Sequence, residues 1–177
     1  MGKVTPHPAN DGSLQPKAPV PLSAEHDLSG FDCGYKELND WLIHRARRNE
    51  GRSSRSYVVA IGRRVVAYYC LSAGAVYRNQ MPKRLQRNAP DEVPIMVLGR
   101  LAVLQSLQGK GFGTGLLRDA MQRTLTVAEI VGARALVVHA LNDKAAEFYQ
   151  HFGFEPSPLN ERTFVLPLET IKHNLQG

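Results

Sequence analysis

The sequence predicts an α+β (α/β) domain in which helices flank a mixed, mostly antiparallel β sheet. Residues 56–61 and 64–71 are rich in β-branched and aromatic side chains around Gly62, the pattern of an antiparallel hairpin. Residues 95–104 form an almost continuous apolar run, which is typical of a central strand covered on both faces. After this run and a glycine-rich loop, apolar side chains recur every three or four residues, and this spacing predicts a long helix that ends near Gly132.

The length and composition of the chain fit one globular domain. The chain has 177 residues, of which 43% are hydrophobic and 21% are charged, so it is long enough to bury a single core. Its apolar runs are shorter than the roughly 20 residues that span a bilayer, and we expect a cytoplasmic protein that does not enter the membrane. We expect a flexible proline-rich tail over residues 1–21, a folded domain over 22–170 and a C-terminal tail over 171–177.

An amphipathic helix is predicted before the hairpin. Tyr35, Leu38 and Trp41 follow helical spacing, so the helix should run over about 34–50 and place the indole of Trp41 in the core. Between the hairpin and the central strand, the polar residues 79–90 predict an exposed loop.

The C-terminal third predicts two strands and one short helix. Residues 134–140 are apolar enough for a further buried strand, and residues 163–168 supply the last strand. Between them, Asn142 is suited to cap a helix that continues to about His151. These elements complete the sheet and its covering helices.

The charge of the chain is strongly positive and comes mainly from arginine. The formal net charge is +6, and the chain holds 15 arginines and 7 lysines. The segment 45–64 contains seven arginines and one acidic residue, Glu50. Guanidinium groups are suited to bidentate phosphate contacts, so a nucleic-acid partner is one interpretation, and a solvated basic face is the other.

A glycine-rich loop, QGKGFGT over residues 108–114, joins the central strand to the long helix. Glycines at such a junction let backbone N–H groups approach a bound anion closely. The spacing is neither that of a dinucleotide-binding fingerprint, because Thr114 stands where a third glycine is needed, nor that of a Walker A loop, because Gly111 follows Lys110. Taken alone, the loop fits either an anion site or a purely structural start of a helix.

Three segments together resemble the GNAT superfamily of N-acetyltransferases. These are RLAV followed by Gln108, Gly111 and Gly113, then Asn142, and then FYQHFGF over 148–154. The resemblance implies a GNAT fold, a central strand pair that splays apart and acetyl-CoA as the cosubstrate, with no metal. It implies cofactor contacts from Leu101, Ala102, Val103, Gln108, Gly109, Lys110, Gly111, Phe112, Gly113, Thr114 and Asn142.

The same resemblance implies that Tyr149 is the general acid. Acetyl transfer needs a proton for the departing thiolate, and a phenol with a pKa of about 10 keeps its proton at neutral pH. The alternative is a tyrosine that only packs in the core. His139, which continues a buried strand, and His151, at a helix end, are weaker candidates.

Within the superfamily, residues 22–168 resemble the GNAT toxins of bacterial toxin–antitoxin systems. The resemblance is carried by FDCGYKELNDWL, VVAYYCLSAGAV, LGRLAV, QGKGFG and FYQHFGF. It implies acetylation of the amino group of an aminoacyl-tRNA, which blocks translation, and a homodimer. It also implies neutralisation by a ribbon-helix-helix antitoxin, with operator DNA bound only through the antitoxin complex.

If the substrate is an aminoacyl-tRNA, the arginines can contact its phosphates. An α-amino group with a pKa of about 7.7 to 8.0 is already partly neutral at cellular pH, so it needs no dedicated base. The candidate tRNA contacts are Arg45, Arg48, Arg52, Arg55, Arg84 and Arg87. Arg100 lies inside the apolar strand and either faces the acceptor site or is structural.

Two other functions remain open at this point. An N-acetyltransferase that acts on a small-molecule amine or on a protein would share the cofactor site without needing the arginine surface. A catalytically silent module that binds coenzyme A or an antitoxin is opposed by Tyr149 and by the intact loop. The sequence does not identify the amino acid or the tRNA that is modified.

Overall fold

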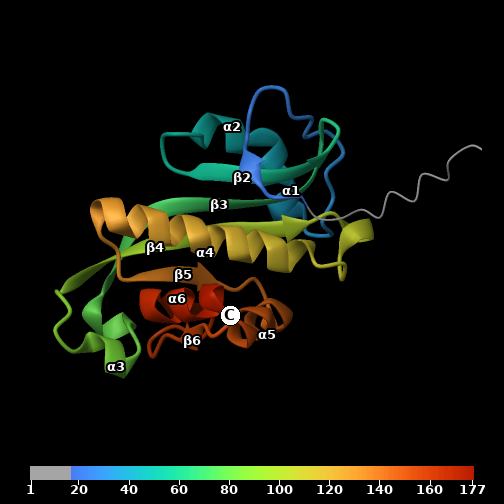
Figure 1. The fold of residues 1–177 in the computed structure, drawn as a ribbon. Coiled ribbons are helices and arrows are strands. Elements are labelled where there is room, and N and C mark those ends of the chain that lie inside the picture. The colour runs from blue at the N-terminus through green and yellow to red at the C-terminus, as the bar shows by residue number, and fades with distance from the viewer. Residues whose placement is uncertain (1–16) are drawn as a thin grey trace, which may run out of the picture.

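The computed structural model describes residues 17–177, which form one seven-stranded sheet with helices on both faces (Figure 1). The sheet order is β1-β2-β3-β4-β5-β7-β6. The strands are β1 (Val20–Pro21), β2 (Arg55–Ile61), β3 (Arg64–Tyr77), β4 (Glu92–Val103), β5 (Ala135–His139), β6 (Glu155–Pro156) and β7 (Thr163–Pro167). The helices are α1 (Lys36–His44), α2 (Ala46–Asn49), α3 (Lys83–Gln86), α4 (Phe112–Val131), α5 (Asp143–His151) and α6 (Leu168–Gln176), with short 3-10 turns η1 (Arg78–Gln80) and η2 (Gln105–Leu107).

The sheet is mixed and mostly antiparallel, as the sequence predicts. Only the β4–β5 pair is parallel among the described strands. The predicted hairpin is present as β2 and β3, and β3 continues beyond its predicted end to Tyr77. The long apolar run lies in β4, at the centre of the sheet.

Both faces of the central strands are buried. On one face, α4 lies across the sheet and buries Leu116, Leu117 and Met121 in the largest core cluster (Figure 1). On the other face, α1 buries Trp41 and Leu42 in a second cluster. This double coverage explains why the sequence of β4 is apolar on both sides of its pleat.

The central strands β4 and β5 splay apart. The parallel β4–β5 pairing ends where Leu98 lies opposite Val138, but β4 runs on to Val103. Beyond that point β4 remains paired with β3 on its other side, through Ala67 opposite Val103. The result is a wedge-shaped gap between β4 and the chain that follows β5.

Three predicted boundaries differ from the structure. The predicted helix 34–50 is interrupted at Arg45, whose backbone (φ −123°, ψ −29°) separates α1 from α2. The predicted C-terminal tail 171–177 is wrong, because most of it belongs to α6, and the fully buried side chain of Ile171 holds this helix against the core. The predicted exposed loop 79–90 contains α3, and its turns bury Met81 and Ala89.

The N-terminal boundary of the folded domain also differs from the prediction. Residues 1–16 of the predicted tail lie outside the described residues, but Val20 and Pro21 of the same stretch form β1. Val20 lies opposite Val58 of β2, so β1 extends the sheet by two residues. None of the helices in residues 17–177 is both long and apolar enough to cross a bilayer.

Candidate active site

The gap between β4 and β5 opens into a cavity of about 600 Å³. Four stretches of chain line it: the segment before and at the start of α1, the end of β4, the glycine-rich loop, and the chain from the end of β5 into α5. The lining includes Leu101, Ala102, Val103, Gln108, Gly109, Gly113, Asn142 and Tyr149 among the residues predicted to bind the cofactor or to act on it.

The free edge of β4 supplies backbone groups to the cavity. The N–H of Leu104 donates to the carbonyl of Val66 on the β3 side, at 2.8 Å. Backbone groups alternate sides along a strand, so those of Leu101 and Val103 face the gap and those of Ala102 face β3. An elongated ligand with amide groups could pair with this edge as an additional strand would.

The glycine-rich loop presents backbone N–H groups at the start of α4. Gly109 and Gly111 have φ values of 75° and 89°, in the left-handed region that favours glycine, and Gly111 caps the helix. The N–H of Gly115 makes the first helical bond, to the carbonyl of Gly111 at 3.1 Å. The N–H groups of residues 112–114 therefore point out of the helix end, where an anion is stabilised.

Side chains of the loop hold it in place. The Gln108 amide donates to the carbonyls of Cys33 and Val103, both at 2.9 Å, which ties the loop to β4 and to the N-terminal segment. Phe112 is 3% exposed and packs in the core, so only its backbone can contact a ligand. Lys110, Gly111, Phe112 and Thr114 do not line the cavity itself but lie on the loop and the first turn beside it.

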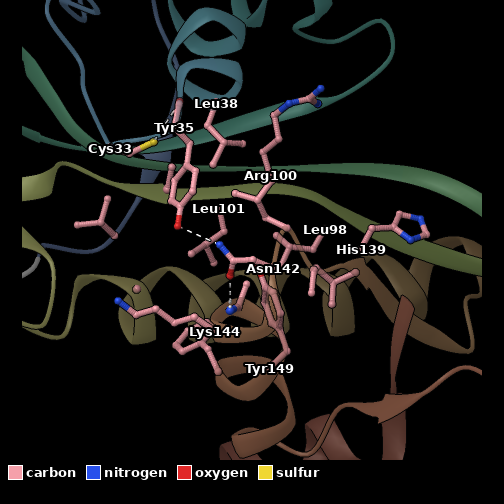
Figure 2. Close-up of a pocket in the computed structure, with 18 of the residues that line it drawn as sticks. Cys33, Tyr35, Leu38, Leu98, Arg100, Leu101, His139, Asn142, Lys144 and Tyr149 are labelled. Atoms are coloured by element: carbon pink, nitrogen blue, oxygen red, sulfur yellow. Dashed lines mark hydrogen bonds between the residues drawn. The ribbon is translucent and has the colours of Figure 1, made fainter. Parts of the chain in front are cut away.

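Both groups of the Asn142 side-chain amide form hydrogen bonds within the protein. Its Oδ1 accepts the N–H of Ala145 at 2.9 Å, as expected of the residue that caps α5. Its Nδ2 donates to the hydroxyl of Tyr35 at 2.9 Å, and Figure 2 shows this bond crossing from α5 to the N-terminal segment. Asn142 lines the cavity, but it also joins the two sides of it.

Tyr149 reaches the cavity from α5. Its side chain is 6% exposed and lines the cavity, and Figure 2 shows the ring rising from α5 toward Asn142 and Leu98. The ring packs edge-on against Phe148 and Phe154, with centroid distances of 5.3 Å. Burial raises the pKa of the Tyr149 phenol above its usual value, so the phenol stays protonated at neutral pH.

The two histidines differ in position. His139 is the last residue of the buried strand β5, as predicted, but its own side chain is exposed and the residue lines the cavity. Its Nδ1 shares a hydrogen bond of 2.8 Å with the hydroxyl of Thr163. His151 is exposed in the last turn of α5, as predicted, and does not line the cavity.

The N-terminal wall of the site was not predicted from the sequence. Cys33, Tyr35, Glu37 and Leu38 line the cavity opposite α5. No sequence signal connects these residues to a loop that lies about 70 positions later, because tertiary packing alone brings them together. Lys144 and Phe148 were also not predicted; they lie four residues apart and so share one face of α5.

The predicted tRNA-binding arginines fall into two separate groups. The arginines 45, 48, 52 and 55 lie on or beside α2, at the β2 edge of the sheet, and all four are exposed. Arg84 and Arg87 lie at α3, which packs near β6 at the opposite edge (Figure 1). The sheet therefore separates the two groups.

The two groups also differ in how their charges are used. In residues 17–177, Arg45, Arg48 and Arg52 have no carboxylate partner, while Arg55 lies 3.5 Å from Glu50. Arg84 is bound by Glu155 through two hydrogen bonds, which raises the pKa of its guanidinium and neutralises its charge. Within the part of the chain that the structure describes, Arg84 is therefore ion-paired, whereas Arg45, Arg48 and Arg52 are not.

Arg100 lies beside the cavity and also packs against α1. Its backbone lies in β4 and the residue lines the cavity. Its guanidinium carbon lies 4.4 Å from the centroid of the Trp41 ring, and Figure 2 shows the side chain directed toward α1 and away from Tyr149. The stacking on Trp41 holds a positive charge beside the N-terminal wall of the cavity.

The described residues contain no cluster of three or more histidine, cysteine, aspartate or glutamate side chains that could hold a metal ion. The cavity offers other features instead: a free strand edge, a helix N-terminus and a protonated phenol. An elongated ligand with amide groups and a diphosphate would fit this arrangement, and its reactive end would lie beside Tyr149.

Comparisons with known proteins agree with this chemistry. Residues 52–156 match the acetyltransferase (GNAT) domain family. The tRNA-acetylating toxin of Mycobacterium tuberculosis is 44% identical over 156 residues, which cover 88% of this chain and 94% of that protein.

Two solved structures have the same fold. AtaT complexed with acetyl-methionyl-tRNAfMet has a TM-score of 0.82 and 34% identity, and the match covers 89% of this chain and 98% of that one. A tyrosine-to-phenylalanine mutant of AtaT, bound to the C-terminus of the antitoxin AtaR and to acetyl-CoA, has a TM-score of 0.77 and 31% identity. That match covers 90% of this chain and 97% of that one.

Proposed function

This chain belongs to the GNAT acetyltransferase family, and we propose that it transfers the acetyl group of acetyl-CoA to the α-amino group of an aminoacyl-tRNA. Such a modification would block translation, so the protein would act as a toxin. One observation carries the proposal: the gap between β4 and β5 leads from the glycine-rich loop directly to Tyr149.

The site fits acetyl-CoA in three places. The N–H groups of residues 112–114 would hold its diphosphate, and the free edge of β4 at Leu101 and Val103 would pair with its amides. Gln108 would fix the glycine-rich loop relative to the β4 edge, because its side-chain amide donates a hydrogen bond to the carbonyl of Val103. Bound in this way, acetyl-CoA would supply the acetyl group as a thioester at the inner end of the gap.

Tyr149 would complete the transfer by proton donation. The neutral amine forms a bond to the thioester carbonyl carbon, and the carbon–sulfur bond breaks as the thiolate leaves. The Tyr149 phenol, kept protonated by burial, would give its proton to that sulfur. The amine would lose one proton to solvent. Solvent would in turn return a proton to Tyr149 and so restore its phenol.

The choice of amine rests on the arginines and on the relatives. An α-amino group needs no strong base, because its pKa of about 7.7 to 8.0 leaves it partly neutral at cellular pH. The arginines at α2 would contact the phosphates of the acceptor stem, with Arg45, Arg48 and Arg52 free of carboxylate partners in the described residues. The relatives with similar sequences include one named for acetylating tRNA and one solved with an acetylated aminoacyl-tRNA.

We also propose the partners of a toxin of this kind. The solved relative AtaT is bound to the C-terminus of the antitoxin AtaR, and a corresponding antitoxin would neutralise this protein. We propose that this antitoxin has a ribbon-helix-helix fold and that operator DNA is contacted only through it. The active toxin would be a homodimer.

The test is acetyl transfer from radiolabelled acetyl-CoA to total charged tRNA by the purified protein. Label should appear on RNA and should be absent when the aminoacyl ester is first removed by mild base. Label on free polyamines or proteins, with none on charged tRNA, would refute the tRNA substrate while leaving the acetyltransferase assignment intact.

A further inference from the structure

One hydrogen bond between side chains crosses the cavity from wall to wall. The Nδ2 group of Asn142 donates to the hydroxyl of Tyr35 at 2.9 Å, and both residues line the cavity. Tyr35 directly precedes α1 on the N-terminal wall, and Asn142 caps α5 on the opposite wall. We call this contact the Tyr35–Asn142 bridge, or simply the bridge.

The bridge separates two ends of the cavity. Figure 2 shows Cys33 and Lys144 on one side of the bond, and Arg100 and His139 on the other. The glycine-rich loop lies at the Cys33 end, because the Gln108 amide donates to the carbonyl of Cys33 at 2.9 Å. The loop and the Arg100 end of the cavity are therefore on opposite sides of the bridge.

Acetyl-CoA bound in the proposed position must pass the bridge. Its diphosphate would lie at residues 112–114, near Gln108 and so on the Cys33 side. Its thioester would lie beside Tyr149, which Figure 2 shows on the same side of the bridge as Leu98. The pantetheine between these two groups would run beneath the bridge, along the free edge of β4.

The two partners of the bridge differ in how firmly their side chains are held. The Oδ1 of Asn142 accepts the N–H of Ala145 at 2.9 Å, so the amide has a fixed direction. Tyr35 is 44% exposed, and its hydroxyl makes no other hydrogen bond within residues 17–177. Its ring packs against no other aromatic ring in the same part of the chain. The Tyr35 side chain can therefore swing into solvent while Asn142 stays in place.

The main chain at Tyr35 is fixed, so this motion needs only side-chain rotation. The carbonyl of Tyr35 accepts the N–H of Asn39 at 3.1 Å, in the first turn of α1. The N–H of the preceding residue, Gly34, donates to the carboxylate of Asp32 at 2.8 Å. Exposed side chains change rotamer within picoseconds to nanoseconds. The bridge would thus open and close many times before a cofactor molecule arrives.

We propose that the Tyr35–Asn142 bridge is a gate through which coenzyme A and acetyl-CoA enter and leave the cavity. The bridge joins two protein groups, so it needs no cofactor to form and closes over an empty or a filled cavity. A gate of this kind lowers the rates of binding and of release by the same factor, the fraction of time that it is open. The inference rests on the cofactor site of the proposed function and not on its tRNA substrate.

The experiment measures the association and dissociation rate constants of coenzyme A on the immobilised protein by surface plasmon resonance. Tyr35→Phe removes only the hydroxyl, so both rate constants should rise about fivefold, the effect of losing one ordinary hydrogen bond, and Kd should stay unchanged. Tyr77→Phe is the matched control, because Tyr77 is an exposed tyrosine at the end of β3, outside the cavity. Its rate constants should equal those of the unmodified chain.

A second variant breaks the bridge from the other wall. Serine is also a preferred residue at a helix N-cap, so Asn142→Ser keeps the cap of α5 and loses the amide that reaches Tyr35. Its rate constants should rise as they do in Tyr35→Phe. Combining the two changes should give no further rise, because each removes the same bond.

Three results would overturn the gate. Rate constants that do not change in Tyr35→Phe would show that the bridge does not control access. Faster dissociation alone, with a weaker Kd, would make Tyr35 a direct cofactor contact. A further rise in the double variant would show that Tyr35 and Asn142 act separately. An unmodified chain without affinity for coenzyme A would refute the proposed cofactor site together with the gate, whereas failure to acetylate charged tRNA would leave the measured rate constants, and the gate, intact.

Discussion

The cofactor end of the site and the arginine surface contrast sharply. The cofactor end is built from residues that are close in sequence: β4, the short turn η2, the glycine-rich loop and α4 follow one another along the chain. The arginine surface consists of two groups from opposite edges of the sheet, and one member, Arg84, is already neutralised by Glu155. Positions in the first region follow from local backbone geometry, whereas positions in the second depend on the path of the whole chain.

The contrast shows which inferences are safe from a sequence. A loop that starts a helix must place its N–H groups at the helix end, so its chemistry follows directly from its residues. A surface charge has no such constraint, because a nearby carboxylate from another part of the chain can bind it.

The largest effect is expected at the cofactor end, from Tyr149→Phe. The variant removes the proton donor and keeps the buried ring, so turnover should fall on the order of 10²- to 10⁴-fold. Calorimetry should give nearly unchanged affinity for acetyl-CoA, because the loop and the β4 edge are untouched. Unchanged turnover would remove Tyr149 from the chemistry.

The pH dependence provides a second test of the same residue. Burial raises the pKa of Tyr149 above its usual value of about 10, so the acid should keep its proton, and the rate should not decline up to that pH. At low pH, kcat/KM should fall as the substrate amine becomes protonated, below about 7.7 to 8.0. A decline of the rate between pH 8 and 9 would contradict the position of Tyr149 in a buried site.

A smaller effect is expected in the glycine-rich loop, from Gly111→Ala. Gly111 has a φ of 89°, and a side chain in the left-handed region costs roughly 1–2 kcal/mol. The free loop would relax out of this conformation and would have to return to it on binding, so affinity for coenzyme A, measured by calorimetry, should fall on the order of 10-fold. Gly115→Ala is the matched control, because Gly115 lies in α4 with open space around it, and this change should leave affinity unaltered.

The two sides of the cavity are joined by Asn142, and its loss should act mainly on stability. Asn142→Ala removes the cap of α5 and the bond to Tyr35, so the free energy of unfolding should drop by about 1 kcal/mol. Asn142→Asp keeps the capping oxygen and should be nearly neutral. Equal losses from both variants in a denaturant titration would mean that the bond to Tyr35, and not the cap, stabilises the site.

The smallest effect is expected at the arginine surface. Arg52→Gln should reduce the steepness with which charged-tRNA acetylation falls with salt, by a log slope of about 0.7 to 0.9 for one phosphate contact. Arg84→Gln should leave that slope unchanged, since Glu155 already binds Arg84. Equal changes in slope from the two variants would show that the groups act alike, against the contrast drawn from the structure.

The sequence predicted the parts of the fold that have a local signature. The hairpin, β4, α4 and the capped α5 all lie where periodicity, glycines and Asn142 indicated. The C-terminal helix α6 was missed because its apolar stripe is short, and Ile171 becomes buried only against α4 and the sheet. The break at Arg45 likewise has no proline or glycine to mark it.

The site was predicted in part for the same reason. Leu101, Val103 and Tyr149, to which the resemblance assigns cofactor and catalytic roles, line one cavity. The wall formed by Cys33, Tyr35, Glu37 and Leu38 comes from the other end of the chain and carries no motif.

A crystal structure of the protein with coenzyme A bound would show directly whether the gap between β4 and β5 holds the cofactor. The account predicts that the diphosphate accepts hydrogen bonds from the N–H groups of residues 112–114, that the pantetheine lies along β4 and that the thiol lies within hydrogen-bonding distance of the Tyr149 hydroxyl. A cofactor bound outside the gap between β4 and β5, or a Tyr149 hydroxyl directed away from the thiol, would contradict it.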